Sequence, residues 1–335
     1  MVVKMNLIKK IFSIKNDNKH TIYNFLGIKI KFKIKEFKKT IYLQNRNHEI
    51  IIRQTCPLCD SEHFLLKNTY DINLLIERWK GKYAFIPIAD CYKDKVLERR
   101  VCKNCGLNYY NYFLPDTNEF YQKLITLQSI YATNKFDYDE AINIVQQFRP
   151  ESLLDIGCGY GYFLDKIKNY VKFVAGTEFN DTAIKVCKKK NINIYNSDLS
   201  QIDKKFDMIT AFQVLEHVKD VKNFIKNSIN RLNTGGVLLF VTPNPESELI
   251  KYNPGILELP PHHNLDISKE AFEYIAKEYN LQIIDYKKQD IDLYGYEIYL
   301  KSKYNINFDK SMYNAYLQEK NNLVGKSHLV CYKKL

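Results

Sequence analysis

Two groups of residues in this chain have the types and spacing of a binding site. The first is an acidic residue followed by three glycines. Asp155 precedes Gly157, Gly159 and Gly161, and a short apolar run stands before it. Glycines at alternate positions let the backbone turn sharply and leave no Cβ between the main chain and a ligand. A phosphate-binding turn holds its anion with bare amides at a helix N-terminus. A carboxylate two residues before the first glycine repels phosphate, so the pattern predicts a ligand with a cationic amino-acid group.

The second group consists of four cysteines in two C-x-x-C pairs. They are Cys56, Cys59, Cys102 and Cys105. Four thiolates paired in this way predict a tetrahedral zinc ion, and four protein sulfurs leave no open position, so the zinc is expected to be structural. Gly106 follows the second pair, where a residue with left-handed backbone is expected; Asp60 follows the first pair and adopts that conformation less easily. The chain between the pairs must fold out as an inserted subdomain that contains Trp79.

The elements that must position the first group begin near residue 150. From there apolar runs alternate with amphipathic segments, as in a doubly wound sheet. We expect strands near 152–157, 173–178, 192–198, 206–214, 236–243, 281–290 and 328–334, and helices near 160–170, 181–190, 220–232 and 268–279. The predicted fold is α/β, with a seven-stranded, mostly parallel sheet that binds its ligand at the carboxyl ends of the strands.

Residues 150–290 resemble the class I S-adenosylmethionine (SAM) methyltransferases, which have a Rossmann-like fold. After the glycine turn, an acid ends the second strand and another the third, and Leu215-Glu216-His217 and Asn233-Thr234-Gly235-Gly236 follow in order. The resemblance implies that Glu178 binds the ribose hydroxyls and that Asp198 faces the adenine amino group. The full set of predicted cofactor-binding residues is Asp155, Gly157, Gly159, Gly161, Glu178, Asp198 and Gln213.

A nicotinamide-dependent dehydrogenase shares two of these features, the glycine turn and an acid after the second strand. An acid in the position of Asp155 is not expected in a dehydrogenase, and neither are the Leu215-Glu216-His217 and Asn233-Thr234-Gly235-Gly236 motifs. The residues therefore favour SAM over NAD as the cofactor.

Two adjacent histidines are candidates for the chemistry of transfer. His262 and His263 follow two prolines after the predicted fifth strand, in a stretch that overhangs the carboxyl ends of the strands in this fold. Methylation of an alcohol releases a proton, and a histidine base contributes about 10²–10⁴-fold near neutral pH. We predict His263, and after it His262, as base or substrate contact; the alternative is that both shape the loop or cap the next helix. His217 is expected to be structural, and Tyr131 to cover the cofactor or to pack in the core.

Charge is distributed unevenly along the chain. The formal net charge is +12, and residues 1–50 hold eleven Lys and one Arg against three acidic residues. The remainder lacks the basic character expected of a nucleic-acid-binding domain. Within the leader, Ile28, Ile30, Phe32 and Ile34 alternate with lysines, which predicts a strand with one cationic face. This strand is either a solvated edge hairpin or a surface that docks to an anionic membrane or to glycan-assembly enzymes.

Three regions are predicted: a basic leader over 1–50, a zinc-ribbon subdomain over 51–115, and a SAM-binding methyltransferase domain with a helical lead-in over 116–335. The sequence has no apolar run of about 18 residues and no signal-peptide pattern. We therefore expect a cytoplasmic protein. If the leader docks to the membrane rather than forming a solvated hairpin, the contact is a peripheral one at the inner face. The eight cysteines are then thiols or metal ligands.

The cysteine region resembles the zinc ribbon of SAM methyltransferases that modify sugars. The run Asn24-Phe25-Leu26-Gly27-Ile28-Lys29 resembles a leader on enzymes of bacterial capsule and lipooligosaccharide gene clusters. These resemblances imply methyl transfer to a hydroxyl of a sugar nucleotide or surface-glycan precursor, a small carbohydrate acceptor. Transfer to a carbon of the sugar also stays open, because deoxysugar C-methyltransferases with such a ribbon exist. Two other functions remain as alternatives: an RNA methyltransferase that binds nucleic acid with its ribbon, and a non-catalytic module that binds SAM.

Overall fold

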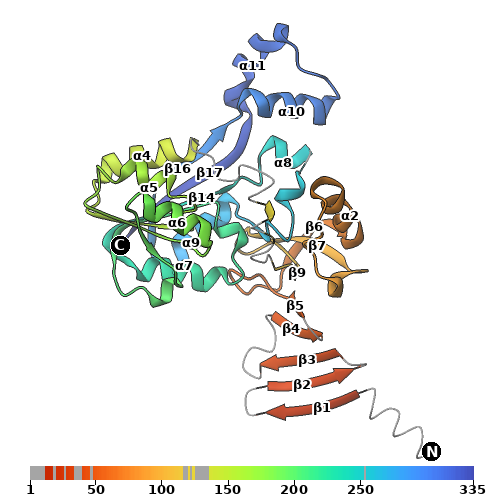
Figure 1. Ribbon diagram of the computed structural model, residues 1–335. Helices are drawn as coiled ribbons and strands as arrows, with labels where there is room; N and C mark the ends of the chain where they lie inside the picture. The colour runs from red at the N-terminus through yellow and green to blue at the C-terminus, as the bar shows by residue number, and fades with distance from the viewer. Residues whose placement is uncertain are drawn as a thin grey trace, which may run out of the picture. The chain divides into compact units, whose positions relative to one another are not determined.

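The computed structural model describes residues 50–115, 137–252 and 254–335 in full, together with Phe120, Lys123 and Leu124. Before residue 50 it describes the backbone of five strands. The chain divides into two compact units (Figure 1). The N-terminal unit comprises residues 1–117 and 259–264, and the C-terminal unit comprises 118–258 and 265–335. The predicted division at residues 50 and 115 stays a prediction, and Tyr131 lies outside the described residues.

The C-terminal unit is built on a seven-stranded sheet. Its strands are β10 (Ser152–Ile156), β11 (Phe173–Thr177), β12 (Asn193–Tyr195), β13 (Phe206–Phe212), β14 (Leu232–Pro243), β16 (Leu281–Asp290) and β17 (Val324–Lys334). They lie in the order β12-β11-β10-β13-β14-β17-β16. The first five are parallel, and β17 runs antiparallel to β14 and β16. The predicted α/β fold with a mostly parallel seven-stranded sheet is confirmed.

Helices cover both faces of this sheet. On one face α4 (Phe136–Phe148), α5 (Tyr162–Ile167) and α6 (Asp181–Lys189) pack with the strands into one apolar core. On the other face Phe224 of α7 (Val221–Asn230) lies 6.1 Å from Phe240 of β14 between ring centroids. The carbonyl of Phe272 in α9 (Lys269–Glu278) accepts a hydrogen bond from the hydroxyl of Tyr332 in β17. Ser268, the predicted N-cap, accepts the amide of Ala271 at the start of α9, as expected of a capping serine.

An insertion between the last two strands was not predicted. It contains α10 (Leu293–Tyr304), the single turn Lys310–Met312, α11 (Tyr313–Glu319) and the turn Lys320–Asn322. Its aromatic core joins α8 (Glu248–Tyr252), since Tyr252 lies 6.1 Å from Tyr299 between ring centroids. Figure 1 shows α10 and α11 at the end of β16 and β17.

The N-terminal unit contains two antiparallel sheets. The first joins β1 (Phe12–Asp17), β2 (His20–Phe25), β3 (Ile28–Lys33), β4 (Thr40–Asn45), β5 (His48–Arg53) and β9 (Tyr112–Phe113) in this order. The second joins β6 (Phe64–Asp71), β7 (Val96–Cys102) and β8 (Asn108–Tyr110). The predicted leader strand is present as β3, whereas its side chains lie outside the described residues.

The segment between the cysteine pairs folds out as predicted. It consists of β6, α2 (Ile72–Tyr83), the single turn Asp90–Tyr92 and β7. Trp79 of α2 is fully buried and packs against Tyr83 and Phe85 at 5.4 and 5.9 Å between ring centroids. This aromatic cluster gives the long insertion a core of its own.

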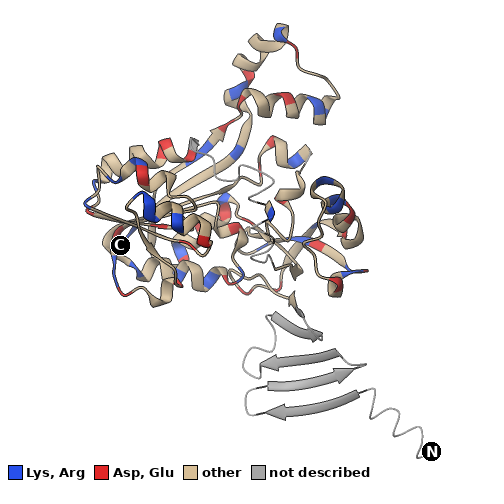
Figure 2. Ribbon diagram, viewed as in Figure 1, with Lys and Arg blue, Asp and Glu red and all other residues tan. Residues whose placement is uncertain are grey.

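Charged residues of both signs are interspersed along the helices of the C-terminal unit (Figure 2). None of the helices within the described residues has the length and apolar character needed to cross a membrane.

Candidate functional site

The glycine turn lies at the carboxyl end of β10, where the sequence predicted the cofactor. Gly157, Gly159 and Gly161 have φ of +66°, +53° and +68°. A Cβ on Gly157 would stand 2.8 Å from Val214, and one on Gly161 would stand 2.7 Å from Ile192. Both the left-handed backbone and the lack of space therefore require glycine at these two positions.

Asp155 is held at the end of β10 just before the turn. It is 3% exposed, and the hydroxyl of Thr210 donates to its Oδ1 at 2.7 Å. Thr210 is in register with Asp155 on the neighbouring strand β13. A buried carboxylate is expensive unless it meets positive charge or hydrogen-bond donors. The hydrogen bond from Thr210 therefore orients the carboxylate, and its negative charge suits a ligand with an ammonium group.

Glu178 follows β11 and ties the turn to the next loop. Its carboxylate accepts the amides of Gly159, Phe179 and Asn180 at 2.9, 2.8 and 2.8 Å. An ionised carboxylate has about four acceptor positions. The three amides occupy three of these positions and fix the side chain. The remaining acceptor position could accept a hydrogen bond from a ribose hydroxyl.

Asp198 and Gln213 follow the carboxyl ends of β12 and β13. Asp198 Oδ1 caps a short turn by accepting from the amide and hydroxyl of Ser200 at 2.9 and 3.0 Å. Gln213 follows β13 with φ of +56°, and its Nε2 donates to Ser327 Oγ at 3.3 Å. The structure gives both residues a local role beside their predicted contacts with the cofactor, which stay predictions.

The two histidines belong to the N-terminal unit. His262 and His263 lie in the segment 259–264, with their rings stacked at 4.5 Å between centroids. Asn264 anchors this segment: its Oδ1 accepts the amide of Leu114 at 3.0 Å and its Nδ2 donates to the carbonyl of Leu114 at 2.9 Å. Arg53 Nη1 donates to the Asn264 carbonyl at 3.2 Å. The anchor was not predicted, and the catalytic role of both histidines stays a prediction.

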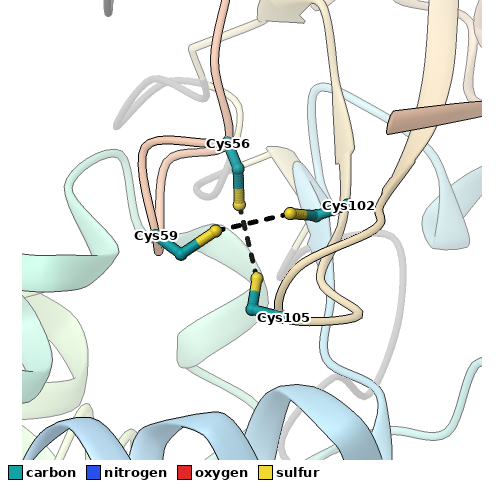
Figure 3. Close-up of side chains that lie close together, drawn as sticks. All are labelled: Cys56, Cys59, Cys102 and Cys105. Atoms are coloured by element: carbon teal, nitrogen blue, oxygen red, sulfur yellow. Dashed lines mark hydrogen bonds between the residues drawn. The ribbon is translucent and has the colours of Figure 1, made fainter. Parts of the chain in front are cut away.

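The four predicted zinc ligands come together in the N-terminal unit, where their sulfurs point toward one another (Figure 3). All four lie within 4.8 Å of each other, with Cys56–Cys105 at 3.5 Å and Cys59–Cys102 at 3.4 Å between sulfurs. A tetrahedron with zinc–sulfur bonds of about 2.3 Å has sulfur–sulfur edges of about 3.8 Å. The cluster therefore fits a zinc ion after small adjustments.

The turns that carry these cysteines have the same backbone. Asp60 and Gly106 have φ of +60° and +76°, and their amides donate to the carbonyls of Cys56 and Cys102 at 2.9 and 3.0 Å. The predicted left-handed residues are confirmed. A hydrogen bond from Cys56 lowers the pKa of Cys59 to about 6, whereas hydrogen bonds with Cys102 raise the pKa of Cys56 and that of Cys105.

Sequence reasoning missed one buried titratable group, His328 in β17. It is 1% exposed, with Thr242 Oγ1 2.9 Å from its Nε2 and the Tyr286 hydroxyl 3.1 Å from its Nδ1. Burial, reinforced by the charge of Lys288, lowers its pKa to about 3. A single histidine within an apolar strand gives no sequence signal of its own.

His328 predicts a loss of stability in acid. The folded chain keeps the imidazole neutral to about pH 3, whereas the unfolded chain binds a proton near pH 6.5. Its contribution is complete above pH 6.5 and is lost as the pH falls, by about 2 kcal/mol at pH 5. Urea unfolding at pH 7 and pH 5 measures this difference, and His328→Gln should reduce it by that amount. An equal loss in both proteins would contradict the assignment.

Comparison with known proteins matches part of the chain. Residues 135–286 match the family model described as a methyltransferase domain. A ubiquinone biosynthesis O-methyltransferase from Coxiella burnetii is 34% identical over 105 residues, which are 29% of this chain and 45% of that protein. A probable S-adenosylmethionine-dependent methyltransferase from Mycolicibacterium smegmatis is 26% identical over 139 residues, 40% of this chain and 52% of that protein. The chain thus covers about half the length of these relatives.

Solved structures are similar to this chain at a lower sequence identity than these relatives. The N-methyltransferase NodS from Bradyrhizobium japonicum in complex with S-adenosyl-l-homocysteine aligns with 62% of this chain and 89% of its own length. The sequence identity is 15% and the TM-score is 0.42.

Proposed function

We propose that this chain, whose C-terminal unit carries a class I SAM-dependent methyltransferase domain, transfers the methyl group of SAM to a hydroxyl of a small carbohydrate. The acceptor is a sugar nucleotide or a surface-glycan precursor. The zinc ion has a structural role in the N-terminal unit.

The observation that carries the proposal is the carboxylate of Asp155 before the glycine turn. It is buried, oriented by Thr210 and followed by three glycines with left-handed backbone. This arrangement favours a ligand with an ammonium group and disfavours a diphosphate, since like charges repel. SAM carries an ammonium and a sulfonium and no phosphate, so it matches this site. Its sulfonium methyl group is the one that is transferred.

Transfer to oxygen and the carbohydrate class have separate support. The name of the Coxiella burnetii relative includes O-methyltransferase, which supports oxygen as the methylated atom. The carbohydrate acceptor is supported by the resemblances of the leader and the zinc ribbon. In this proposal the residues of the β10 turn hold the donor. His263 takes the proton of the acceptor hydroxyl as the new oxygen–carbon bond forms, the carbon–sulfur bond of SAM breaks, and S-adenosylhomocysteine is released.

A methyl-transfer assay tests the proposal. The full-length protein is incubated with SAM and a panel of nucleotide-activated sugars and phosphorylated glycan precursors, and the products are read by mass spectrometry. A gain of one methyl group on a sugar oxygen supports it. Methylation of RNA alone, or bound SAM without turnover across the panel, would replace it with one of the two alternatives.

The role of His263 makes its own prediction. His263→Ala should lower kcat by about 10²–10⁴-fold, because the acceptor then loses its proton without a positioned base. The affinity for SAM, measured by calorimetry, should stay within twofold. His63→Ala, at an exposed histidine of the same unit, is the matched control and should leave both values unchanged. A full rate in His263→Ala would remove the residue from the mechanism.

A further inference from the structure

Two cysteines of the C-terminal unit meet at the glycine turn. Cys158 stands between Gly157 and Gly159 in the turn itself, and Cys187 lies in α6. Both thiols donate to the same atom, the carbonyl oxygen of Gly159, at 3.2 Å from Cys187 Sγ and 3.8 Å from Cys158 Sγ. The fold therefore brings two thiols together at the backbone that is expected to hold the cofactor.

Two glycines provide the space for these sulfurs. A Cβ on Gly176 of β11 would stand 2.4 Å from Cys158 Sγ, and a Cβ on Gly161 would stand 3.0 Å from Cys187 Sγ. Cys158 is 7% exposed and Cys187 is fully buried, and both belong to the apolar core that α5 and α6 form with the sheet. Close packing thus confines the two side chains to the same small region.

The two thiols differ in acidity. A hydrogen bond between them lowers the pKa of Cys187 and raises that of Cys158. The charge of Lys190, whose Nζ donates to the carbonyl of Tyr160 at 3.0 Å, also lowers the pKa of Cys187, whereas burial raises the pKa of Cys158 further. The thiolate is the reactive form of cysteine, so Cys187 is the nucleophile of the pair and Cys158 is the resolving thiol.

We propose that Cys158 and Cys187 form a reversible disulfide that weakens SAM binding when the protein is oxidised. The pair is then a modification site that makes the cofactor turn sensitive to peroxides. This inference uses the cofactor turn alone and does not depend on the identity of the acceptor.

The oxidation proceeds in two steps with a peroxide as oxidant. The Cys187 thiolate attacks one oxygen of hydrogen peroxide, the oxygen–oxygen bond breaks, and a sulfenic acid and hydroxide form. The Cys158 thiol then attacks the sulfenic sulfur, so that the sulfur–sulfur bond forms, the sulfur–oxygen bond breaks and water leaves. The two sulfurs lose two electrons in all, the peroxide gains them, and both thiol protons end in the two waters.

The disulfide changes the environment of Gly159. A sulfur–sulfur bond of about 2.05 Å is shorter than a hydrogen bond between thiols, so the turn and α6 must draw together. The carbonyl of Gly159 also loses both of its thiol donors. The amide of the same residue donates to Glu178 Oε2 at 2.9 Å, and Glu178 is the predicted ribose ligand. A shift of Gly159 therefore disturbs the site for SAM.

Peroxide treatment of the full-length protein tests the pairing. After alkylation of the remaining thiols, peptide mapping by mass spectrometry identifies the bond, and titration calorimetry measures the affinity for SAM. We expect one cross-linked peptide pair that contains Cys158 and Cys187. The affinity for SAM should fall by about tenfold or more, a coupling of ordinary size for linked sites, and should recover with dithiothreitol.

Variants separate this disulfide from other effects of peroxide. Cys187→Ser keeps a donor for the Gly159 carbonyl but cannot form the bond, so its affinity for SAM should not respond to peroxide. Cys187→Ala repeats the test without a hydroxyl in the core, and circular dichroism checks both folds. Cys91→Ser, at a partly buried thiol of the N-terminal unit, is the matched control and should respond to peroxide as the wild type does.

A glutathione redox buffer adds a readout that a purely structural pair would not move. Because linkage is reciprocal, SAM at concentrations that saturate both forms should lower the equilibrium constant for disulfide formation. The factor should equal the one by which the disulfide lowers the affinity for SAM.

Three results would overturn the proposal: a cross-link between other cysteines instead of this pair, an oxidised protein that binds SAM as tightly as the reduced one, or loss of affinity in oxidised Cys187→Ser equal to that of the wild type. None of these measurements uses an acceptor. The disulfide can therefore fail while the proposed function stands, and a protein that shows the disulfide but methylates no sugar would have the opposite outcome.

Discussion

Asp155→Asn is expected to weaken SAM binding by about 30-fold to several thousand-fold. The change keeps the shape of the side chain and removes the charge that should face the ammonium group of the ligand. Truncating one partner of a buried, hydrogen-bonded charge pair costs about 2–5 kcal/mol, from which this range follows. Titration calorimetry with SAM measures the dissociation constant, and circular dichroism checks the fold.

The matched control is another aspartate close to the turn. Asp165 lies on α5 and pairs at the surface with Lys168 at 2.7 Å. Asp165→Asn should leave the affinity for SAM within twofold. An Asp155→Asn protein that bound SAM within threefold of the wild type would show that the ligand's cation lies elsewhere, and would refute the donor site.

Loss of a single zinc ligand is expected to destabilise the N-terminal unit by several kcal/mol. The purified chain should contain about one zinc ion, and Cys59→Ser should contain close to none, because three sulfurs no longer complete the tetrahedron. In small zinc domains metal binding supplies about 10–16 kcal/mol of folding energy, so its removal outweighs ordinary core substitutions. Elemental analysis measures the metal, and urea unfolding of the full-length chain measures stability.

Cys91 provides the control for this experiment. It is a partly buried free thiol and is not among the four clustered sulfurs. Cys91→Ser should keep the zinc content and the unfolding midpoint of the wild type. The zinc assignment would be refuted by a wild-type protein that carries no metal after purification without chelators, or by equal metal loss in both variants.

The parts of the fold that local sequence determines were predictable. The strand expected at 206–214 is β13 (Phe206–Phe212), because a buried parallel strand reads as an apolar run that ends at a turn. The left-handed Asp60 and Gly106 follow from the local geometry of a cysteine turn. In these cases a few neighbouring residues carry the whole signal.

Other features depend on residues that are far apart in the sequence. Leu114 and Asn264 are separated by 150 positions, and neither has a local pattern that indicates the other. The helix α10 carries tyrosines and lysines around its whole circumference, so it lacks the apolar stripe by which a helix is recognised.

The Asn264 anchor has a consequence for protein engineering. Because residues 259–264 fold with residues 1–117, the N-terminal unit is discontinuous along the gene. A chimera that exchanges only the first 117 residues for those of a relative would separate Asn264 from Leu114 and Arg53, with which it forms its hydrogen bonds. The ribbon and the histidine segment must therefore be exchanged together, and changes in one constrain which changes the other tolerates.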